Sequence, residues 1–241
     1  MRGMELKKLN KLDDFLLFNF LAKDKQNAEE IIDAGLGFVV PGIVSSEFTR
    51  IEDGIKKVAE LKEISSVVSI GLGDNGNPAN WEKVLHIAAG ANPGHINQPF
   101  EKSSYARGYL KAKGINQVVN GLVSPAGKVG YVKLSGVEIR VEDLVDLAVS
   151  MGVESIKFMP LKGLTHLEEL VYLCKVASEK GIVSIEPAGG ISAENIVEIV
   201  NGVRDTGISV FMPHIFGSTI DKETGRTIPQ EVEKIVSLVR G

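Results

Sequence analysis

A lysine at the end of a short apolar run is the residue in this sequence best suited to do chemistry. The run is Ser155-Ile156-Lys157-Phe158-Met159-Pro160, and side chains along a β-strand alternate between two faces. Ile156 and Phe158 then share one face, while Lys157 lies on the other. Burial lowers the pKa of a lysine from about 10.4 towards neutrality, and a neutral amine can add to a ketone and form a Schiff base. The sequence therefore predicts a nucleophilic Lys157.

A carboxylate occupies the equivalent place on the next predicted strand. Ser184 and Glu186 alternate with Val183 and Ile185, so Glu186 is predicted to face the same interior as Lys157. Two interpretations follow. Glu186 can transfer protons in a reaction at Lys157, or the two residues can form a structural ion pair between neighbouring strands.

Two glycines follow Glu186 directly, in the segment Glu186-Pro187-Ala188-Gly189-Gly190-Ile191-Ser192. Glycines let backbone N–H groups approach an anion, and a helix beginning near Ser192 would add unpaired donors. We predict a phosphate site at Gly189, Gly190 and Ser192, with Gly217 and Ser218 closing its other side. The alternatives are a tight turn at the glycine pair and a simple loop with a capping serine.

Further polar residues lie near the ends of predicted strands and are candidates for binding substrate: Asn19, His95, Asn97 and Asn120. Pro160, which ends the lysine segment, and Asp74 complete this set. The segment Gly71-Leu72-Gly73-Asp74-Asn75-Gly76 is rich in glycine but lacks the order of a nucleotide-binding loop. Asp74 can orient a substrate hydroxyl or act as a base, or it can stabilise the turn.

Short apolar runs alternate with amphipathic segments, and a glycine repeatedly marks the end of a helix. We predict eight strands, at 15–20, 37–40, 67–70, 95–97, 118–122, 155–159, 182–186 and 209–212. Helices are predicted at 26–34, 46–62, 80–89, 103–113, 141–151, 164–180, 193–200 and 229–240. Eight such pairs indicate one (β/α)8 barrel domain over residues 1–241, with a doubly wound open sheet as the alternative. Residues 124–136 interrupt the pattern and predict a hairpin inserted after the fifth strand.

Composition limits the partners of the protein. The 241 residues carry a net charge of −4 with a pI near 5.7, which gives no electrostatic reason to expect nucleic acid. No apolar segment approaches the roughly 20 residues that span a bilayer, and the start lacks a signal-peptide core. We therefore expect a cytoplasmic protein without membrane contact. The four histidines are dispersed and only one cysteine is present, so neither a metal site nor a cofactor is predicted.

The order of the lysine and glycine segments resembles a known family. Ile156-Lys157-Phe158-Met159-Pro160 and Pro187-Ala188-Gly189-Gly190-Ile191 resemble the L-K-F-F-P and P-T-G-G-I motifs of 2-keto-3-deoxy-6-phosphogluconate (KDPG) aldolases. Residues 16–28 and 114–125 also resemble passages of those enzymes, so the likeness covers most of the chain. It is closest to a divergent branch associated with D-glucosaminate catabolism, also labelled 4-hydroxy-2-oxoglutarate aldolase.

The resemblance implies a trimeric (β/α)8 aldolase that needs no metal, in which Lys157 forms the Schiff base and the glycine segment binds phosphate. One feature departs from the family. Its second strand carries a glutamate that relays protons, whereas residues 37–43 contain no acid. Glu186 is the first candidate to replace that glutamate, followed by Asp74 and His95.

The predicted reaction cleaves a 2-keto-3-deoxy sugar-acid phosphate into pyruvate and glyceraldehyde 3-phosphate. A 4-hydroxy-2-oxoglutarate substrate, which gives pyruvate and glyoxylate, shares the pyruvate half of that reaction. Two other classes stay open at this point: a barrel epimerase or synthase that binds phosphate without forming an imine, and a non-catalytic sugar-phosphate sensor.

Overall fold

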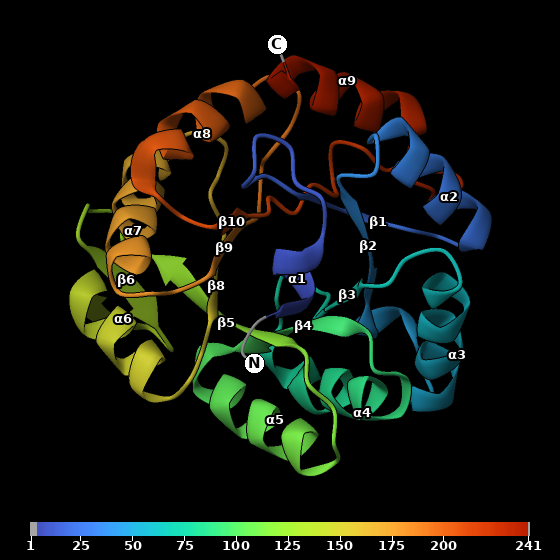
Figure 1. The fold of residues 1–241 in the computed structure, drawn as a ribbon, viewed down its shortest axis with the longest axis horizontal. Helices are drawn as coiled ribbons and strands as arrows, with labels where there is room; N and C mark the ends of the chain where they lie inside the picture. Colours follow the sequence, from blue (N-terminus) through green and yellow to red (C-terminus); the bar gives the residue numbers. More distant parts are fainter. Residues whose placement is uncertain (1–3, 241) are drawn as a thin grey trace.

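Eight parallel strands surrounded by helices form the body of the protein, as a computed structural model that describes residues 4–240 shows (Figure 1). The strands are adjacent in the order β1-β2-β3-β4-β5-β8-β9-β10. Their bounds are Phe18–Leu21 for β1, Val39–Val44 for β2, Val68–Gly71 for β3, Gly94–Pro99 for β4, Val118–Pro125 for β5, Ser155–Phe158 for β8, Ser184–Pro187 for β9 and Val210–Phe211 for β10.

Helices connect the strands and form an outer ring (Figure 1). They are α2 (Lys25–Ala34), α3 (Ile51–Lys62), α4 (Trp81–Ala91), α5 (Phe100–Ala112), α6 (Val141–Ser150), α7 (Leu167–Glu179), α8 (Ile196–Val203) and α9 (Pro229–Arg240). None of the helices within residues 4–240 is long and apolar enough to cross a membrane.

Backbone hydrogen bonds join the last strand to the first and close the barrel. Leu17 N donates to Phe211 O at 3.0 Å, Asn19 N donates to Pro213 O at 3.0 Å, and Ile215 N donates to Asn19 O at 2.9 Å. An open doubly wound sheet would leave these two edges unpaired. The (β/α)8 prediction is therefore confirmed and the open sheet is excluded.

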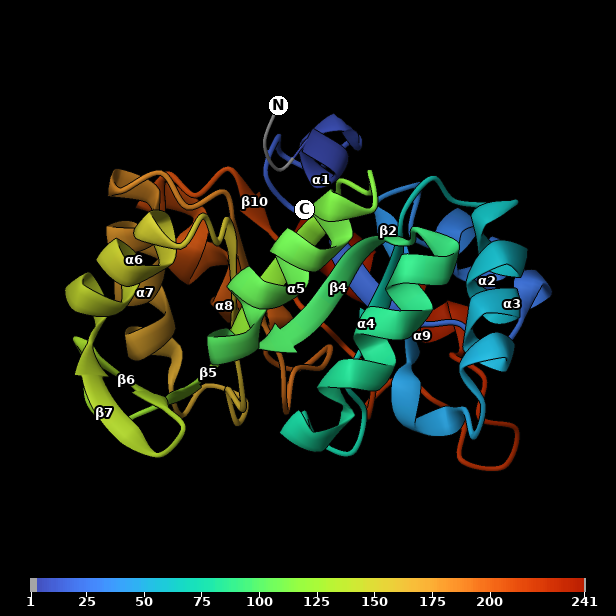
Figure 2. The same ribbon diagram turned by 90° about the horizontal axis from the view of Figure 1, so that it is seen from below.

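Alternation along the strands gives the barrel two separate apolar clusters, one outside the strands and one inside them. Ile156, Phe158 and Ile185 point outward into the main core between strands and helices. The inward residues at the N-terminal end, among them Val40, Val67 and Val210, form a second apolar cluster. The short helix α1 (Met4–Lys8) covers that end and contributes Leu6 to the cluster (Figure 2). This helix was not predicted, because it is shorter than two turns.

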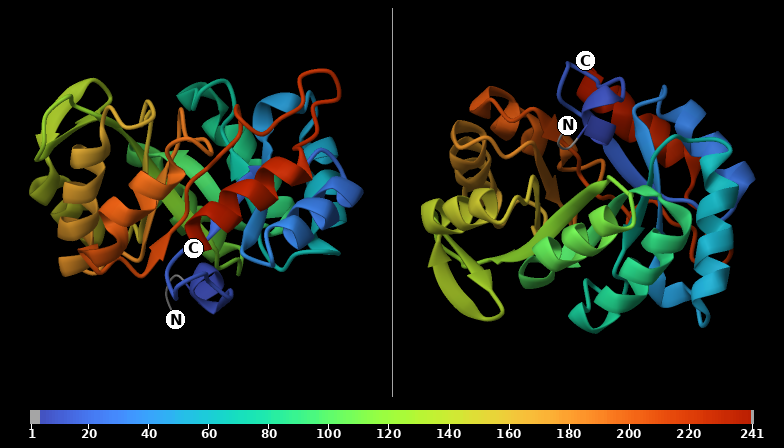
Figure 3. Two further views of the ribbon diagram at one scale, coloured as in Figure 1. Left: turned by 90° about the horizontal axis from the view of Figure 1, so that it is seen from above. Right: turned by 60° about the horizontal axis from the view of Figure 1, so that its bottom comes forward.

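The predicted insertion is present as a hairpin of β6 (Tyr131–Leu134) and β7 (Val137–Arg140). The end of β5 pairs antiparallel with β6, so the hairpin extends from a barrel strand and lies over the outer helices (Figure 3). The segment between β5 and β6 is held against α7 by Glu169, whose carboxylate accepts hydrogen bonds from the backbone N–H groups of Ala126 and Gly127 at 2.9 and 3.0 Å.

The helix after the glycine pair begins later than predicted. Helix α8 starts at Ile196 rather than near Ser192. The side chain of Asn195 accepts from Ser192 N at 3.0 Å and donates to Gly190 O at 2.9 Å. Asn195 thereby holds residues 190–195 as a turn, which separates the glycine pair from the first turn of the helix.

Candidate active site

A cavity of about 550 Å³ opens at the C-terminal ends of the strands. Helix α1 lies at the other end of the barrel (Figure 2). The volume of the cavity lies within the range of about 300–1,000 Å³ that is typical of small-molecule sites. The walls come from five strands, β2, β3, β4, β5 and β8, and from the segments that follow β3, β8, β9 and β10. The location agrees with the rule that barrel enzymes place their sites at this end.

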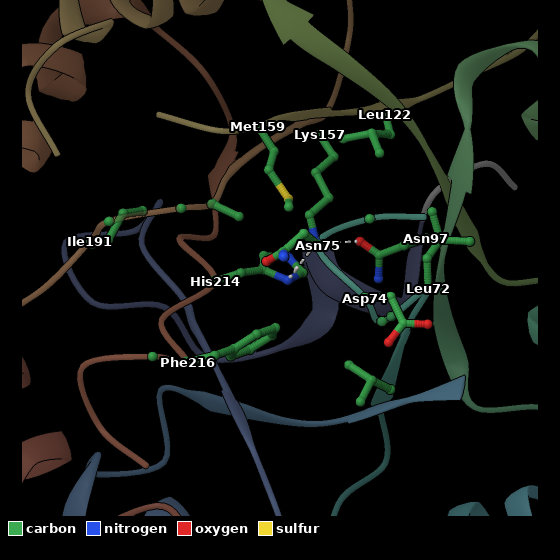
Figure 4. A pocket seen from close by; sticks show the side chains of 18 of the residues that line it. Leu72, Asp74, Asn75, Asn97, Leu122, Lys157, Met159, Ile191, His214 and Phe216 are labelled. Carbon is green, nitrogen blue, oxygen red and sulfur yellow. Dashed lines mark hydrogen bonds between the residues drawn. The ribbon is translucent and has the colours of Figure 1, made fainter. Parts of the chain in front are cut away.

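Lys157 reaches this cavity from β8 (Figure 4). Its side chain lies between two acceptors: Nζ donates to Asn97 Oδ1 at 2.9 Å and to His214 Nδ1 at 3.1 Å. A neutral amine has two N–H groups and one lone pair. Because these two acceptors use both N–H groups, the lone pair of a neutral Lys157 is left for an electrophile in the cavity.

Burial lowers the pKa of Lys157 from 10.5 to about 8, and the negative charge of Glu186 opposes this shift. Only 5% of the residue is exposed, so little water is present to solvate an ammonium ion. Glu186 forms no direct ion pair with Lys157, since His214 stands between the two groups. The amine is therefore held in surroundings that favour its neutral, nucleophilic form.

His214, which follows β10, is a central residue of this site that the sequence analysis did not select. It lines the cavity and contacts Lys157 through Nδ1, while its Nε2 lies 2.9 Å from Glu186 Oε2. The signal for it was present in the alternation of Val210, Met212 and His214. The spacing of the histidines along the chain bears only on metal binding, and Pro213 interrupts the strand pattern before His214.

Glu186 lies deeper in the barrel than predicted and does not line the cavity. It is fully buried and accepts hydrogen bonds on both oxygens. The donors to it are His95 Nε2 at 2.9 Å, His214 Nε2 at 2.9 Å, Asn120 Nδ2 at 2.8 Å, Ser155 Oγ at 2.5 Å and Ser184 Oγ at 3.4 Å. His214, which lines the cavity, contacts Glu186 through Nε2 and Lys157 through Nδ1 and so links the buried carboxylate to the cavity wall.

The protonation of this network follows from its geometry. Burial alone would raise the pKa of Glu186, but the electrostatic influence of His95 and the hydrogen bonds from His214 and His95 outweigh burial and hold this pKa well below its ordinary value. Burial and the neighbouring Lys157 lower the pKa of His214 to about 3 against the influence of Glu186, so its ring is neutral. An ionised carboxylate only accepts hydrogen bonds. His214 must then carry its proton on Nε2, which leaves Nδ1 as an acceptor facing Lys157.

The remaining polar candidates divide into two groups. Asn97 and Asp74 line the cavity. Asn19, His95 and Asn120 are buried beneath it, where Asn19 donates to Val40 O at 2.8 Å and Asn120 donates to Asn97 Oδ1 at 2.8 Å. These three residues support the site and do not form its wall.

Asp74 lies on an unusual loop. Residues 73–76 all have positive φ angles, including the non-glycine residues Asp74 and Asn75 at 47° and 56°. Asp74 Oδ2 accepts from Asn80 Nδ2 at 3.1 Å. The carboxylate is exposed at the mouth of the cavity, so it both stabilises the loop and is available to a ligand.

The predicted phosphate residues meet on one side of the cavity, which Gly189, Gly190, Ser192, Gly217 and Ser218 all line. Ser218 Oγ donates to Ile191 O at 2.9 Å and so ties the loop after β10 to the glycine pair. Within residues 4–240, the backbone N–H groups of Gly190, Ile191, Gly217 and Ser218 donate to no other group.

Close packing explains the glycine pair. A Cβ on Gly189 would lie 2.9 Å from Pro160 Cβ, and a Cβ on Gly190 would lie 2.6 Å from Gly163 N. Both glycines also have positive φ angles, of 94° and 75°. Pro160 is thus placed behind the glycine turn, outside the wall of the cavity.

No cluster of three histidine, cysteine, aspartate or glutamate side chains that could hold a metal ion occurs in the described part of the chain. His95 and His214 each direct Nε2 at Glu186, one to each carboxylate oxygen.

Comparison with known proteins gives a consistent set of relatives. A model of the KDGP aldolase family matches residues 12–223. The chain is 38% identical over 233 residues to a 2-dehydro-3-deoxy-phosphogluconate aldolase of Salmonella typhimurium, a match that covers 92% of this chain and 94% of that protein.

Solved structures similar to this one share its fold at low sequence identity. A tryptophan synthase α-subunit from Pyrococcus furiosus aligns with a TM-score of 0.58 at 14% identity, over 95% of this chain and 98% of that one. A geranylgeranylglyceryl phosphate synthase from Thermoplasma acidophilum aligns with a TM-score of 0.58 at 14% identity, over 100% and 99% of the two chains. Similarity at this level of identity supports the barrel architecture only, and the reaction has to be argued from the residues of the site.

Proposed function

Because the chain belongs to the KDGP aldolase family and is an aldolase, we propose that it cleaves 2-keto-3-deoxy-6-phosphogluconate through a Schiff base on Lys157. The products are pyruvate and glyceraldehyde 3-phosphate. The observation that carries the proposal is the buried amine of Lys157, which lies at the cavity wall between two neutral acceptors. The name of the 38% identical relative supports the choice of substrate.

The reaction begins when the lone pair of Lys157 adds to the C2 carbonyl carbon of the substrate. Loss of the C2 oxygen as water gives an iminium, which draws electrons away from C3. When the C4 hydroxyl loses its proton, the C3–C4 bond breaks and its electrons form an enamine. Glyceraldehyde 3-phosphate leaves. Protonation of C3 and hydrolysis of the iminium then release pyruvate and restore Lys157.

The glycine loops supply a place for the phosphate at the far end of the substrate. Gly190, Ile191, Gly217 and Ser218 offer four backbone N–H groups that have no partner within residues 4–240. Fixed dipoles of this kind stabilise an anion without a cationic side chain. Among the described residues that line the cavity, Lys157 is the only lysine or arginine, and it is committed to the ketone. Binding the phosphate there would hold C2 close to Lys157 and lower the entropic cost of the addition.

Reductive trapping tests the Schiff base. The protein is incubated with pyruvate and borohydride, digested, and analysed by mass spectrometry for one reduced pyruvate on the peptide that contains Lys157. Lys162, which is exposed nearby but outside the cavity, provides the matched control. Lys162→Arg is expected to trap normally and Lys157→Arg to trap nothing. A folded wild-type protein without an adduct on Lys157 would exclude the mechanism.

Steady-state kinetics with two substrates tests the substrate assignment. The value of kcat/KM is expected to be greater for 2-keto-3-deoxy-6-phosphogluconate than for 4-hydroxy-2-oxoglutarate, because only the former carries a phosphate for the glycine loops. A preference for the unphosphorylated acid would transfer the proposal to the aldolase that releases glyoxylate.

A further inference from the structure

The Schiff-base mechanism needs a group that takes and returns protons beside Lys157, and the predicted carboxylate of Glu186 does not reach the cavity. We propose that His214 is the catalytic acid–base residue of this aldolase and that Glu186 is its positioning residue. The inference rests on the proposed Schiff base. In place of a single catalytic carboxylate, it assigns proton transfer to a hydrogen-bonded Glu186–His214–Lys157 series.

The position of His214 suits the proton transfers at the C4 oxygen and at C3 of the substrate. Its Nδ1 lies 3.1 Å from Lys157 Nζ, within direct reach of the atom that becomes the imine nitrogen. The C4 oxygen of the substrate is separated from that nitrogen by four bonds, through C2, C3 and C4. This chain can fold so that the C4 hydroxyl and the imine nitrogen both face Nδ1.

The other ionisable groups are placed less well. Strand β2 carries the sequence Val-Val-Pro-Gly-Ile-Val and contains no acid. Asp74 is the carboxylate among the residues that line the cavity, but it sits on the loop after β3, is exposed, and is hydrogen-bonded to Asn80. His95 contacts Ser69 and Glu186 below the cavity floor. His214 is therefore the ionisable side chain that contacts Lys157 directly.

The proton and electron movements balance over the cycle. The Nδ1 lone pair takes the proton of the C4 hydroxyl, and the electrons of that O–H bond form the aldehyde C=O. The C3–C4 bond electrons form C2=C3, while the π electrons of the iminium move to nitrogen. Nδ1–H then returns its proton to C3 as the iminium re-forms, so that His214 ends the cycle neutral.

Glu186 prepares His214 for this role in two ways. As an ionised acceptor it fixes the proton of the imidazole on Nε2, which directs the basic Nδ1 at the reacting atoms. Its charge also stabilises the imidazolium that forms when Nδ1 takes a proton. Ser155, Asn120 and His95 hold the carboxylate in place from three other strands or strand ends.

The test separates imine formation from proton transfer at carbon, using pyruvate alone. Borohydride trapping on Lys157 reports the imine. Exchange of the pyruvate methyl protons for deuterium in D2O, followed by NMR, reports proton transfer at C3. His214→Gln is expected to retain trapping and to lose exchange by about 100-fold or more, the usual contribution of a general acid–base group. The control His86→Gln alters an exposed histidine on α4 and is expected to change neither measurement.

Glu186→Gln provides a second measurement that keeps His214 in place. It is expected to slow exchange, because the amide N–H of glutamine favours the imidazole tautomer with the proton on Nδ1. It is also expected to move the titration of Lys157 to lower pH, since the carboxylate charge opposes the effect of burial on that lysine. A purely structural role for Glu186 predicts neither effect in the folded variant.

The possible results separate the two proposals. A wild-type protein that traps no pyruvate on Lys157 refutes the Schiff base itself. If the wild-type protein is trapped and a folded His214→Gln variant exchanges at the wild-type rate, the Schiff base stands and the role of His214 is refuted. Should His214→Gln not fold, as judged by circular dichroism, wild-type exchange in folded Glu186→Gln with an unmoved Lys157 titration refutes the series.

Discussion

The reactivity of Lys157 towards a small acylating reagent should follow a pKa near 8. Burial lowers its pKa to about 8 from the ordinary 10.5. At pH 7 about one molecule in eleven then carries the neutral amine, compared with about one in three thousand for an ordinary lysine. The fold thus raises the concentration of the nucleophile roughly 300-fold.

Competitive labelling measures this titration without assuming any catalytic activity. The protein is exposed to trace acetic anhydride at a series of pH values, together with an added amine of known pKa as the internal standard. Mass spectrometry then quantifies acetylation of the Lys157 peptide. Labelling should rise tenfold for each pH unit below about 8 and level off above it, because only the neutral form reacts.

A midpoint near 10.5 would refute this reasoning, since it would mean that water reaches the ammonium ion well enough to cancel the effect of burial. The same measurement on unfolded protein in denaturant should give the ordinary value. That comparison shows whether the shift depends on the tertiary structure.

Two further substitutions test the energetic cost of the site and the packing of the glycine turn. Lys157→Met should stabilise the folded protein below pH 8 by up to about 3.4 kcal/mol, the equivalent of the difference between 10.5 and about 8. This gain should disappear between pH 8 and 10.5, where the folded protein no longer holds a disfavoured charge. Thermal unfolding at several pH values measures it. Gly190→Ala should lower both stability and substrate affinity, because its Cβ would meet Gly163 N. In Gly217→Ala the new Cβ has no neighbour within 4 Å and φ is ordinary, so stability should change by less than about 0.5 kcal/mol. Calorimetry and KM values compare the two variants, and equal effects would contradict the packing argument.

Local sequence determined the elements of the barrel and the face on which its lysine lies. The period-2 alternation of Ile156, Lys157 and Phe158 places the lysine inside the barrel, because successive side chains of a strand must point to opposite faces. The glycine pair is equally local, since positive φ angles at both residues require glycine. The predicted strands and helices are present, with shifts of a few residues at their ends.

Tertiary structure decided which group serves the lysine. Glu186 and Lys157 share a face on adjacent strands, and nothing local to either strand shows that the imidazole of His214 comes between them. That position depends on the closure of the barrel, which brings the segment after β10 against β1 and β9 through backbone bonds such as His214 N to Pro187 O at 2.9 Å. Alternation gives the direction of each side chain, but only the closed barrel gives its depth, and depth separates the buried carboxylate from the histidine at the cavity wall.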